Sequence, residues 1–115
     1  MTDNKSTLLI ANDYISRGDH EGFLSFCTED VVWEFVGDQV LRGKSAVRKY
    51  METVYAEPPE FEVQELLGDH EHVVAVGLIQ LKESNGRTAS FKYCDVWKFR
   101  GGKMASLKAF VVEVN

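Results

Sequence analysis

The 115-residue sequence predicts one α+β domain over residues 1–115, in which three N-terminal helices pack on a strongly curved, mostly antiparallel sheet. Two observations lead to this prediction. Apolar residues at helical spacing are confined to the chain before Pro58-Pro59, and the residues after it alternate with the period of β-strands. Turn-forming pairs such as Asn85-Gly86 and Gly101-Gly102 separate the strand-like runs, which is typical of an antiparallel meander.

Three helices and one strand are expected before the proline pair. The first helix covers about residues 4–17, and the second begins at its N-cap, Asp19, and ends near Thr28. A β-branched and aromatic strand over residues 31–36 precedes the third helix, which has Ser45 near its cap. The apolar residues at helical spacing are Leu8, Ala11 and Ile15, then Phe23, Phe26 and Cys27, then Val47, Tyr50, Met51 and Val54.

The chain after the proline pair is predicted to form four strands, over residues 60–67, 73–82, 88–100 and 104–114. The second and the fourth of these strands are apolar on both faces. Helices can cover only one face of the sheet, and the chain has no helix to spare for the other. A second copy is the simplest cover, so the sequence predicts a homodimer through the sheet.

Composition limits the classes of partner. The net charge is −5 and Lys and Arg form no cluster, so neither nucleic acid nor an anionic membrane surface is an expected partner. The first residues lack the pattern of a secretion signal, and no apolar run approaches the ~20 residues of a membrane span, so a cytoplasmic protein is expected. Cys27 and Cys94 are expected to be reduced thiols without a chemical role.

Asp95 is the strongest functional signal in the sequence. In a strand over residues 88–100, side chains alternate between two faces, which places Asp95 on a face with four aromatic residues. Those residues are Phe91, Tyr93, Trp97 and Phe99. A carboxyl group buried there is either tightly hydrogen-bonded or has a raised pKa that suits chemistry. The functional interpretation is a general acid or oxyanion-site donor, and the alternative is a structural acid paired with a hydroxyl or amide.

Other side chains are candidates for the same site. Tyr14, Tyr50 and Tyr93 are candidate second donors, and Tyr93 is favoured because it shares the face of Asp95 two residues away. The alternative for each tyrosine is core packing. The residues expected to line an apolar pocket are Trp33, Phe35, Tyr50, Trp97, Leu107 and Val111.

Two further motifs do not support a site. His70 and His72 lie beside acidic residues, but Gly68-Asp69 marks an exposed turn and no third ligand has suitable spacing, so no metal is expected. Gly43-Lys44-Ser45 resembles the end of a phosphate-binding loop, but Asp38 stands where that loop needs glycine. No cofactor is expected.

The order of four short sequences resembles the NTF2-like superfamily, and within it the SnoaL-like and ketosteroid-isomerase-like branch. The four are Arg17-Gly18-Asp19, Asp30-Val31-Val32-Trp33-Glu34-Phe35, Leu41-Arg42-Gly43-Lys44-Ser45-Ala46-Val47 and Asp95-Val96-Trp97-Lys98-Phe99-Arg100-Gly101-Gly102-Lys103-Met104. The resemblance spans almost the whole chain. It implies a cone in which a bent sheet wraps round helices, with a closed apolar pocket and commonly a dimer across the convex face.

The resemblance also implies roles for single residues. In ketosteroid isomerases, a tyrosine on the first helix and an aspartic acid on a late strand bind the dienolate oxygen, and a second aspartate moves the proton. Asp95 falls on the late-strand position, but Phe35 stands at the base position and Ala11 at the helix tyrosine. Limonene epoxide hydrolases need an arginine where Tyr93 stands and an aspartate in the final strand, where only Glu113 is close. Classical steroid isomerisation is therefore not expected.

The sequence thus predicts a SnoaL-like protein that binds a small hydrophobic molecule carrying a carbonyl or hydroxyl group. One hypothesis is that the protein is an enzyme of isomerase, cyclase or hydrolase type that uses Asp95 as acid or oxyanion-site donor. The alternative is a non-catalytic ligand carrier or protein-interaction module on the same fold.

Overall fold

The computed structural model describes residues 3–83 and 85–114. These residues form three helices and a six-stranded mixed sheet, so the predicted α+β class is confirmed. The elements are α1 (Asn4–Ser16), α2 (His20–Leu24), β1 (Cys27–Phe35), β2 (Gln39–Arg42), α3 (Lys44–Val54), β3 (Glu60–Asp69), β4 (His72–Lys82), β5 (Thr88–Arg100) and β6 (Lys103–Val114). None of the described helices has the length and apolar character needed to cross a membrane.

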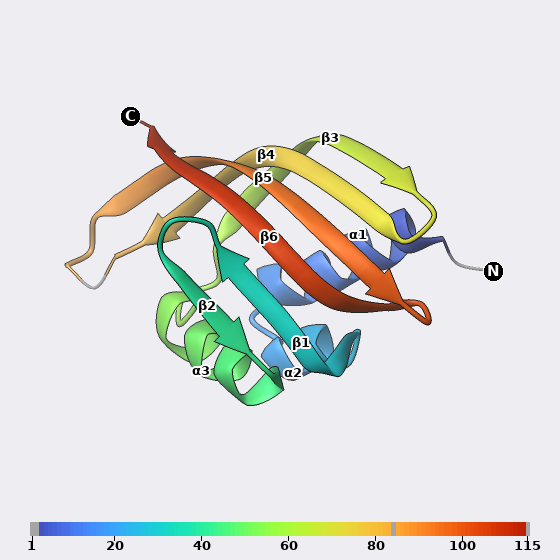
Figure 1. Cartoon of the computed structure of the whole chain (residues 1–115). Coiled ribbons are helices and arrows are strands. Elements are labelled where there is room, and N and C mark those ends of the chain that lie inside the picture. The colour runs from blue at the N-terminus through green and yellow to red at the C-terminus, as the bar shows by residue number, and fades with distance from the viewer. Residues whose placement is uncertain (1–2, 84, 115) are drawn as a thin grey trace.

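The sheet arches over the helices, which gather on its inner side (Figure 1). Its strand order is β2-β1-β6-β5-β4-β3. The strands β3 to β6 form an antiparallel meander, whereas β1 and β6 pair in parallel, with Trp33 opposite Leu107. This parallel pair joins the β1–β2 hairpin to the meander and so extends the arch around the helices.

The helix α2 ends earlier than predicted. It stops at Leu24 rather than near Thr28, and Cys27 is the first residue of β1. The Met104 N–H donates to the Phe26 carbonyl oxygen at 2.8 Å, and Cys27 lies opposite Met104 in the sheet. Pairing with β6 therefore places Cys27 in the sheet, although its spacing from Phe23 in the sequence is helical.

The strand β2 is not indicated by the sequence pattern. Gly37 adopts a φ of 84°, which favours glycine, and the Asp38 N–H closes the turn by donating to the Phe35 carbonyl oxygen at 2.9 Å. The chain then returns along β1. Gly43 ends this return, since its N–H donates to the Val31 carbonyl oxygen at 2.7 Å, and α3 begins at the next residue.

The core lies between the helices and the inner face of the sheet. Leu8 and Ala11 of α1, Phe23 of α2, and Val47 and Met51 of α3 are fully buried. Complete burial of a valine-sized or larger apolar side chain contributes roughly 1.5–3 kcal/mol. Apolar contact is therefore what fixes the helices against the sheet.

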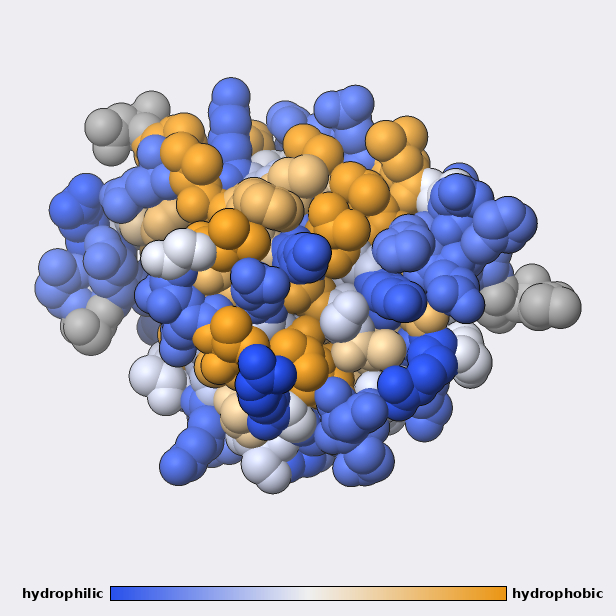
Figure 2. Space-filling model, in the orientation of Figure 1, coloured by the Kyte–Doolittle hydropathy of each residue, from blue (hydrophilic) through white to orange (hydrophobic). Residues whose placement is uncertain are grey.

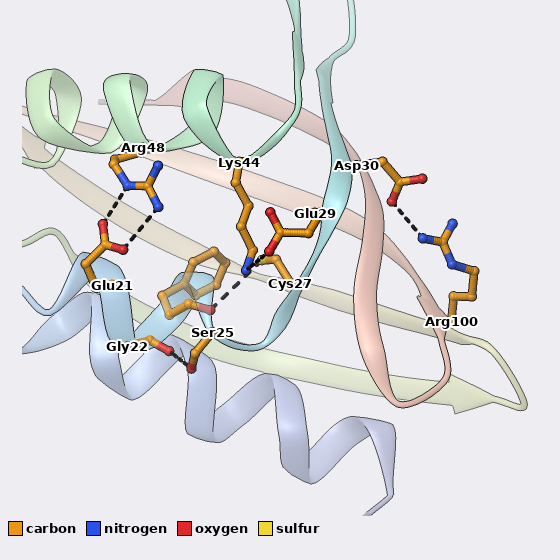
Figure 3. Close-up of polar contacts among 10 residues, drawn as sticks. Glu21, Gly22, Ser25, Cys27, Glu29, Asp30, Lys44, Arg48 and Arg100 are labelled. Carbon is orange, nitrogen blue, oxygen red and sulfur yellow. Dashed lines mark hydrogen bonds and ion pairs between the residues drawn. The ribbon is translucent and has the colours of Figure 1, made fainter.

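Ion pairs at the surface link α2 to α3 and β1 to β5 (Figure 3). Arg48 of α3 contacts Glu21 of α2 with N–O distances of 2.6 and 3.1 Å. Arg100, at the end of β5, contacts Asp30 of β1 at 2.7 Å. The carboxylates of both pairs are largely exposed, so these contacts orient the elements and add little stability.

Gly77 of β4 lies where β3 changes its register. The pairing of the two strands shifts between Val63, which lies opposite Gly77, and Glu65. A Cβ atom built on Gly77 would meet the Glu62 carbonyl oxygen and lie 2.9 Å from the Tyr93 hydroxyl oxygen. Glycine therefore permits both the close approach of the irregular strand and the position of the Tyr93 side chain.

We expect Gly77→Ala to lower the free energy of unfolding by about 1–3 kcal/mol, because the new methyl group must displace the β3 backbone or the Tyr93 ring. Urea denaturation followed by circular dichroism measures the change. Gly68→Ala is the matched control, since the three atoms nearest to a Cβ there all belong to the flexible Lys5 side chain, the first of them at 3.0 Å. Equal loss of stability in the two variants would contradict this account of the bend.

Candidate functional site

A cavity of about 350 Å³ lies between the inner face of the sheet and the helices α1 and α3. This volume is within the range of sites for small organic molecules. Much of its wall is aromatic. The aromatic residues that line it are Trp33, Phe35, Tyr50, Tyr55, Phe61, Phe91, Tyr93 and Trp97. Val36, Asp38 and Val111 also line the cavity and are exposed to solvent, so they mark its opening.

Asp95 lies on the sheet wall of this cavity because of the alternation of side chains in β5. Ala75 of β4 and Ala109 of β6 lie directly opposite it on the two adjoining strands. Both alanines are buried, and their methyl groups occupy little of the space on that face. This row of small residues on either side of Asp95 helps to keep the cavity open.

The Asp95 carboxyl group is half-buried and has no hydrogen-bond partner among the described residues. Among the described residues, two fully buried polar side-chain atoms lack a hydrogen-bond partner. They are Thr28 Oγ1 and Trp33 Nε1. The Asp95 oxygens are not among them, so they meet the open space of the cavity. Burial raises the pKa of Asp95 from 3.8 to about 7, because removal from water disfavours the charged form.

Three tyrosine hydroxyls share the cavity with Asp95. Burial, and then the charge of Asp95, raises the pKa of Tyr93 to about 12. Burial also raises the pKa of Tyr50 to about 12, with further contributions from Asp38 and Asp95. It raises the pKa of Tyr55 well above its usual value. These hydroxyls therefore stay protonated at neutral pH, and each can donate a hydrogen bond to a bound molecule.

Contacts between rings hold the aromatic wall in place. Tyr50 packs on Phe35 with the ring centroids 5.0 Å apart, and its edge-to-face contacts with Trp33 and Tyr55 are at 6.1 and 5.7 Å. Trp33 and Trp97 meet edge to face at 6.0 Å. Such aromatic contacts stabilise one another beyond their apolar burial, so the wall is a connected unit.

The structure brings most of the predicted site residues together. Asp95 and Tyr93 share the cavity with Trp33, Phe35, Tyr50, Trp97, Leu107 and Val111. Tyr14 is the exception and does not line the cavity. Its ring packs on Phe26 with the centroids 5.8 Å apart, and the Arg17 guanidinium lies 4.4 Å from the ring centroid. Tyr14 is therefore not among the side chains that the structure brings together around Asp95.

Sequence reasoning misses Tyr55 and Asp38, which also line the cavity. Tyr55 follows the last residue of α3, where helical spacing no longer predicts its direction. Asp38 lies in the β1–β2 turn. A signal for Asp38 does exist, because it lies in the turn, three residues after Phe35, that ends a strand with Trp33 and Phe35 on one face.

The remaining candidate groups stay outside this site. Among residues 3–83 and 85–114, no group of three or more His, Cys, Asp and Glu side chains is placed to hold a metal ion. His70 and His72 are exposed around the β3–β4 turn. Cys27 is buried, and burial raises the pKa of its thiol to about 12, which keeps it protonated and unreactive.

The profile of the SnoaL-like domain family matches residues 11–107 of the chain. The protein belongs to the SnoaL-like domain family. The match covers both the helices and the sheet, and it includes Asp95 and Tyr93. No curated protein matches this SnoaL-like chain in sequence.

Solved structures with the same fold resemble this SnoaL-like protein over nearly its whole length. The epoxide hydrolase/cyclase-like enzyme SalBIII, described in pyran ring formation in the polyether salinomycin, has a TM-score of 0.87 at 21% identity, with 95% of this chain and 90% of that chain covered. An NTF2-like protein of unknown function from Burkholderia pseudomallei K96243 has a TM-score of 0.84 at 23% identity, with 97% and 92% covered. The Δ5-3-ketosteroid isomerase from Mycobacterium sp. has a TM-score of 0.81 at 14% identity, with 95% and 96% covered. These likenesses show the NTF2-like fold, and the fold is shared by proteins with different activities.

The raised pKa of Asp95 predicts how stability depends on pH. The pKa is about 7 in the folded protein against an ordinary value of 3.8, so the native state binds more protons between these pH values. The contribution of Asp95 to stability is therefore fully present below about pH 4 and is lost as the pH rises through about 7. Over this range we expect the wild type to lose up to about 4 kcal/mol relative to Asp95→Asn, since one pKa unit corresponds to about 1.4 kcal/mol.

Urea denaturation of both proteins from about pH 4 to about pH 8 measures this difference. Asp69→Asn, at an exposed position at the end of β3, is the matched control and should follow the wild type. A constant difference between the wild type and Asp95→Asn across the range would contradict the desolvated state of this carboxyl group.

Proposed function

We propose that the protein binds a small hydrophobic molecule in the cavity and that Asp95 acts on an oxygen of that molecule as a general acid or oxyanion-site donor. The unpartnered Asp95 carboxyl group, on the wall of an aromatic cavity, is the observation that carries this proposal. A desolvated polar group without a partner destabilises the folded protein, so its presence needs a separate reason. A hydrogen bond to a bound carbonyl or hydroxyl oxygen supplies one.

Neutral Asp95 would donate its proton to the ligand oxygen. Such a hydrogen bond strengthens as negative charge develops on that oxygen, because little water is present to screen it. Tyr93 is the favoured second donor, since it shares the cavity face of β5, and Tyr50 and Tyr55 offer hydroxyls from the side of α3. Asp38, at the opening, is the other carboxylate of the cavity and the candidate to accept a proton from the ligand.

A reaction of isomerase, cyclase or hydrolase type suits this arrangement, because each passes charge through one oxygen of the substrate. The similar folds of a ketosteroid isomerase and an epoxide hydrolase/cyclase-like enzyme support the choice of class. Classical steroid isomerisation is disfavoured, because Phe35 and Ala11 occupy the positions of the base and of the helix tyrosine.

A non-catalytic ligand carrier is the second candidate function. The observation that favours it is the distribution of carboxylates, since the wall around Asp95 is mostly aromatic or aliphatic and Asp38 lies out at the opening. A carrier needs only space and a hydrogen-bond donor, whereas an enzyme also needs a group that accepts a proton.

Native mass spectrometry of the purified protein, with identification of the released molecule, tests whether the cavity is the binding site. We expect an organic molecule with a carbonyl or hydroxyl oxygen. Ala109→Leu should lose it, because the larger side chain occupies the space beside Asp95. Retention of the same molecule by this variant, at the wild-type level, would contradict binding in the cavity.

The substitution Asp95→Asn separates an enzyme from a carrier. The amide still donates a hydrogen bond but cannot transfer a proton, so an enzyme should lose about 10²–10³-fold in kcat with a much smaller change in affinity. A carrier should change only in affinity. Tyr14→Phe is the control, because Tyr14 lies outside the cavity and its removal should leave both quantities unchanged.

We also propose that two copies associate through the outer face of the sheet. This face, opposite to the cavity, carries the apolar residues Val74, Val76, Leu78, Cys94, Val96, Phe110 and Val112. Phe110 and Val112 are 45% and 63% exposed, and Figure 2 shows apolar side chains gathered across the sheet. Lys92 and Lys108 lie among these residues and glutamates of β3 border them, so two copies can place opposite charges together.

Light scattering coupled to size exclusion tests the association. We expect the wild type to have twice the mass of one chain and Phe110→Lys to have the mass of one chain, because a buried unpaired ammonium group opposes association. Leu9→Lys is the control, since Leu9 is 46% exposed on α1 rather than on the sheet. A wild type that is monomeric at micromolar concentration would contradict the proposed dimer.

A further inference from the structure

We infer that the cavity accepts molecules without an anionic group and rejects carboxylates and phosphates. This inference rests on the proposed function, because it names the substrate class of the same site. It is carried by two acidic side chains at different depths of the cavity, by the charge of the remaining wall, and by hydroxyl donors that suit an uncharged oxygen.

The two acidic residues lie along the path that a ligand would take. Asp38 is exposed at the opening, and its charge reaches the Tyr50 hydroxyl, whose pKa it raises. Asp95 lies deeper, between Ala75 and Ala109 on the sheet. A ligand therefore passes one carboxylate and comes to rest beside a second carboxyl group.

No lysine, arginine or histidine is found among the described residues that line the cavity. Two arginines of the surrounding elements are held in surface ion pairs instead. Arg48 contacts Glu21 and Arg100 contacts Asp30, as Figure 3 shows. The net charge of the whole chain is −5, so its overall field also opposes an incoming anion.

An anionic ligand would lose its hydration in this cavity without gaining a countercharge. Desolvation of an unpaired ion is strongly unfavourable. The same ligand would repel Asp38 and would further disfavour ionisation of Asp95. An uncharged carbonyl, ester or hydroxyl group avoids these penalties and meets donors on Asp95 and the three tyrosines.

The charge of the cavity also limits which reaction can supply the substrate. A substrate that is made as a carboxylic acid or a phosphate ester must lose or mask that group before it enters. For such a substrate, the supplying reaction is therefore of the class that esterifies, amidates or decarboxylates an acid, or that removes a phosphate.

Binding of isosteric pairs tests the inference. The probes are benzamide and benzoate, cinnamamide and cinnamate, and 2-naphthamide and 2-naphthoate, because the members of each pair share a shape and differ in charge. Calorimetry or ligand-observed NMR at about pH 6 compares them where the acids are ionised and Asp95 is largely neutral. We expect each amide that binds to do so at least about tenfold more tightly than its carboxylate.

A carboxylate that binds as tightly as its amide would overturn the charge selection and leave the proposed function standing. Failure of every amide and every carboxylate to bind would overturn the proposed function, and this inference with it. The two failures are therefore distinguishable.

Reversing the charge of Asp38 tests whether the preference for amides over carboxylates arises at the cavity. Asp38→Lys should reduce the preference for amides by about tenfold, because it places a cation beside the incoming carboxylate. Asp69→Lys makes the same change in charge at an exposed site that does not line the cavity, and it should leave the preference within about twofold of the wild type. An equal effect of the two substitutions would overturn the inference, because the selection would then follow net charge alone.

Discussion

The site depends on a single constraint, which is the inward direction of the Asp95 carboxyl group. The alternation of β5 couples Asp95 to Tyr93 and Trp97, so it cannot turn outward unless these two buried rings turn outward as well. The aromatic burial therefore holds a carboxyl group where ionisation is unfavourable. A structural acid in such a place would have hydrogen bonds to compensate, and Asp95 has none among the described residues. This combination of desolvation and missing partners is typical of functional sites.

The curvature of the sheet provides the space in front of Asp95. Gly77 lets β3 approach and change register beside β4, and the parallel pairing of β1 with β6 carries the sheet around the helices. Ala75 and Ala109 then leave room on either side of the carboxyl group. The cavity thus results from small residues at a few positions of an otherwise large and aromatic face. Without them the same face would pack as an ordinary core.

The meander is the part of the fold that the sequence predicts best. The predicted strand over residues 88–100 has the bounds of β5, because period-two alternation and flanking turn pairs are local signals. The early end of α2 and the strand β2 are not predicted, since both depend on pairing with chain segments that are distant or weakly patterned. Cys27 fits a helical face by its spacing, yet it pairs with Met104, 77 positions later in the chain.

The candidate site also contains residues that the sequence predicts and residues that it does not. Asp95, Tyr93 and Trp97 come together because they share one strand, and alternation alone predicts that. Tyr14 does not join them, because its ring packs on Phe26, whereas Asn12 and Ile15 of the same helix line the cavity. Tyr55 and Asp38 lie just beyond a helix and a strand, where the backbone turns and no periodicity applies. Positions at the ends of elements therefore need the tertiary structure, even when the elements themselves are predicted.

The strands that hold Asp95 are apolar on both faces, and the two faces serve different proposed contacts. Successive residues of β5 belong to opposite faces, so Cys94 lies on the proposed dimer surface while Asp95 faces the cavity. Association of two copies would bury the outer face and restrict the bending of β4, β5 and β6. Restricted bending would hold the distance between Asp95 and the wall formed by α3, on which the proposed recognition of a ligand oxygen depends. The proposed dimer surface and the proposed site thus share the backbone of the same three strands.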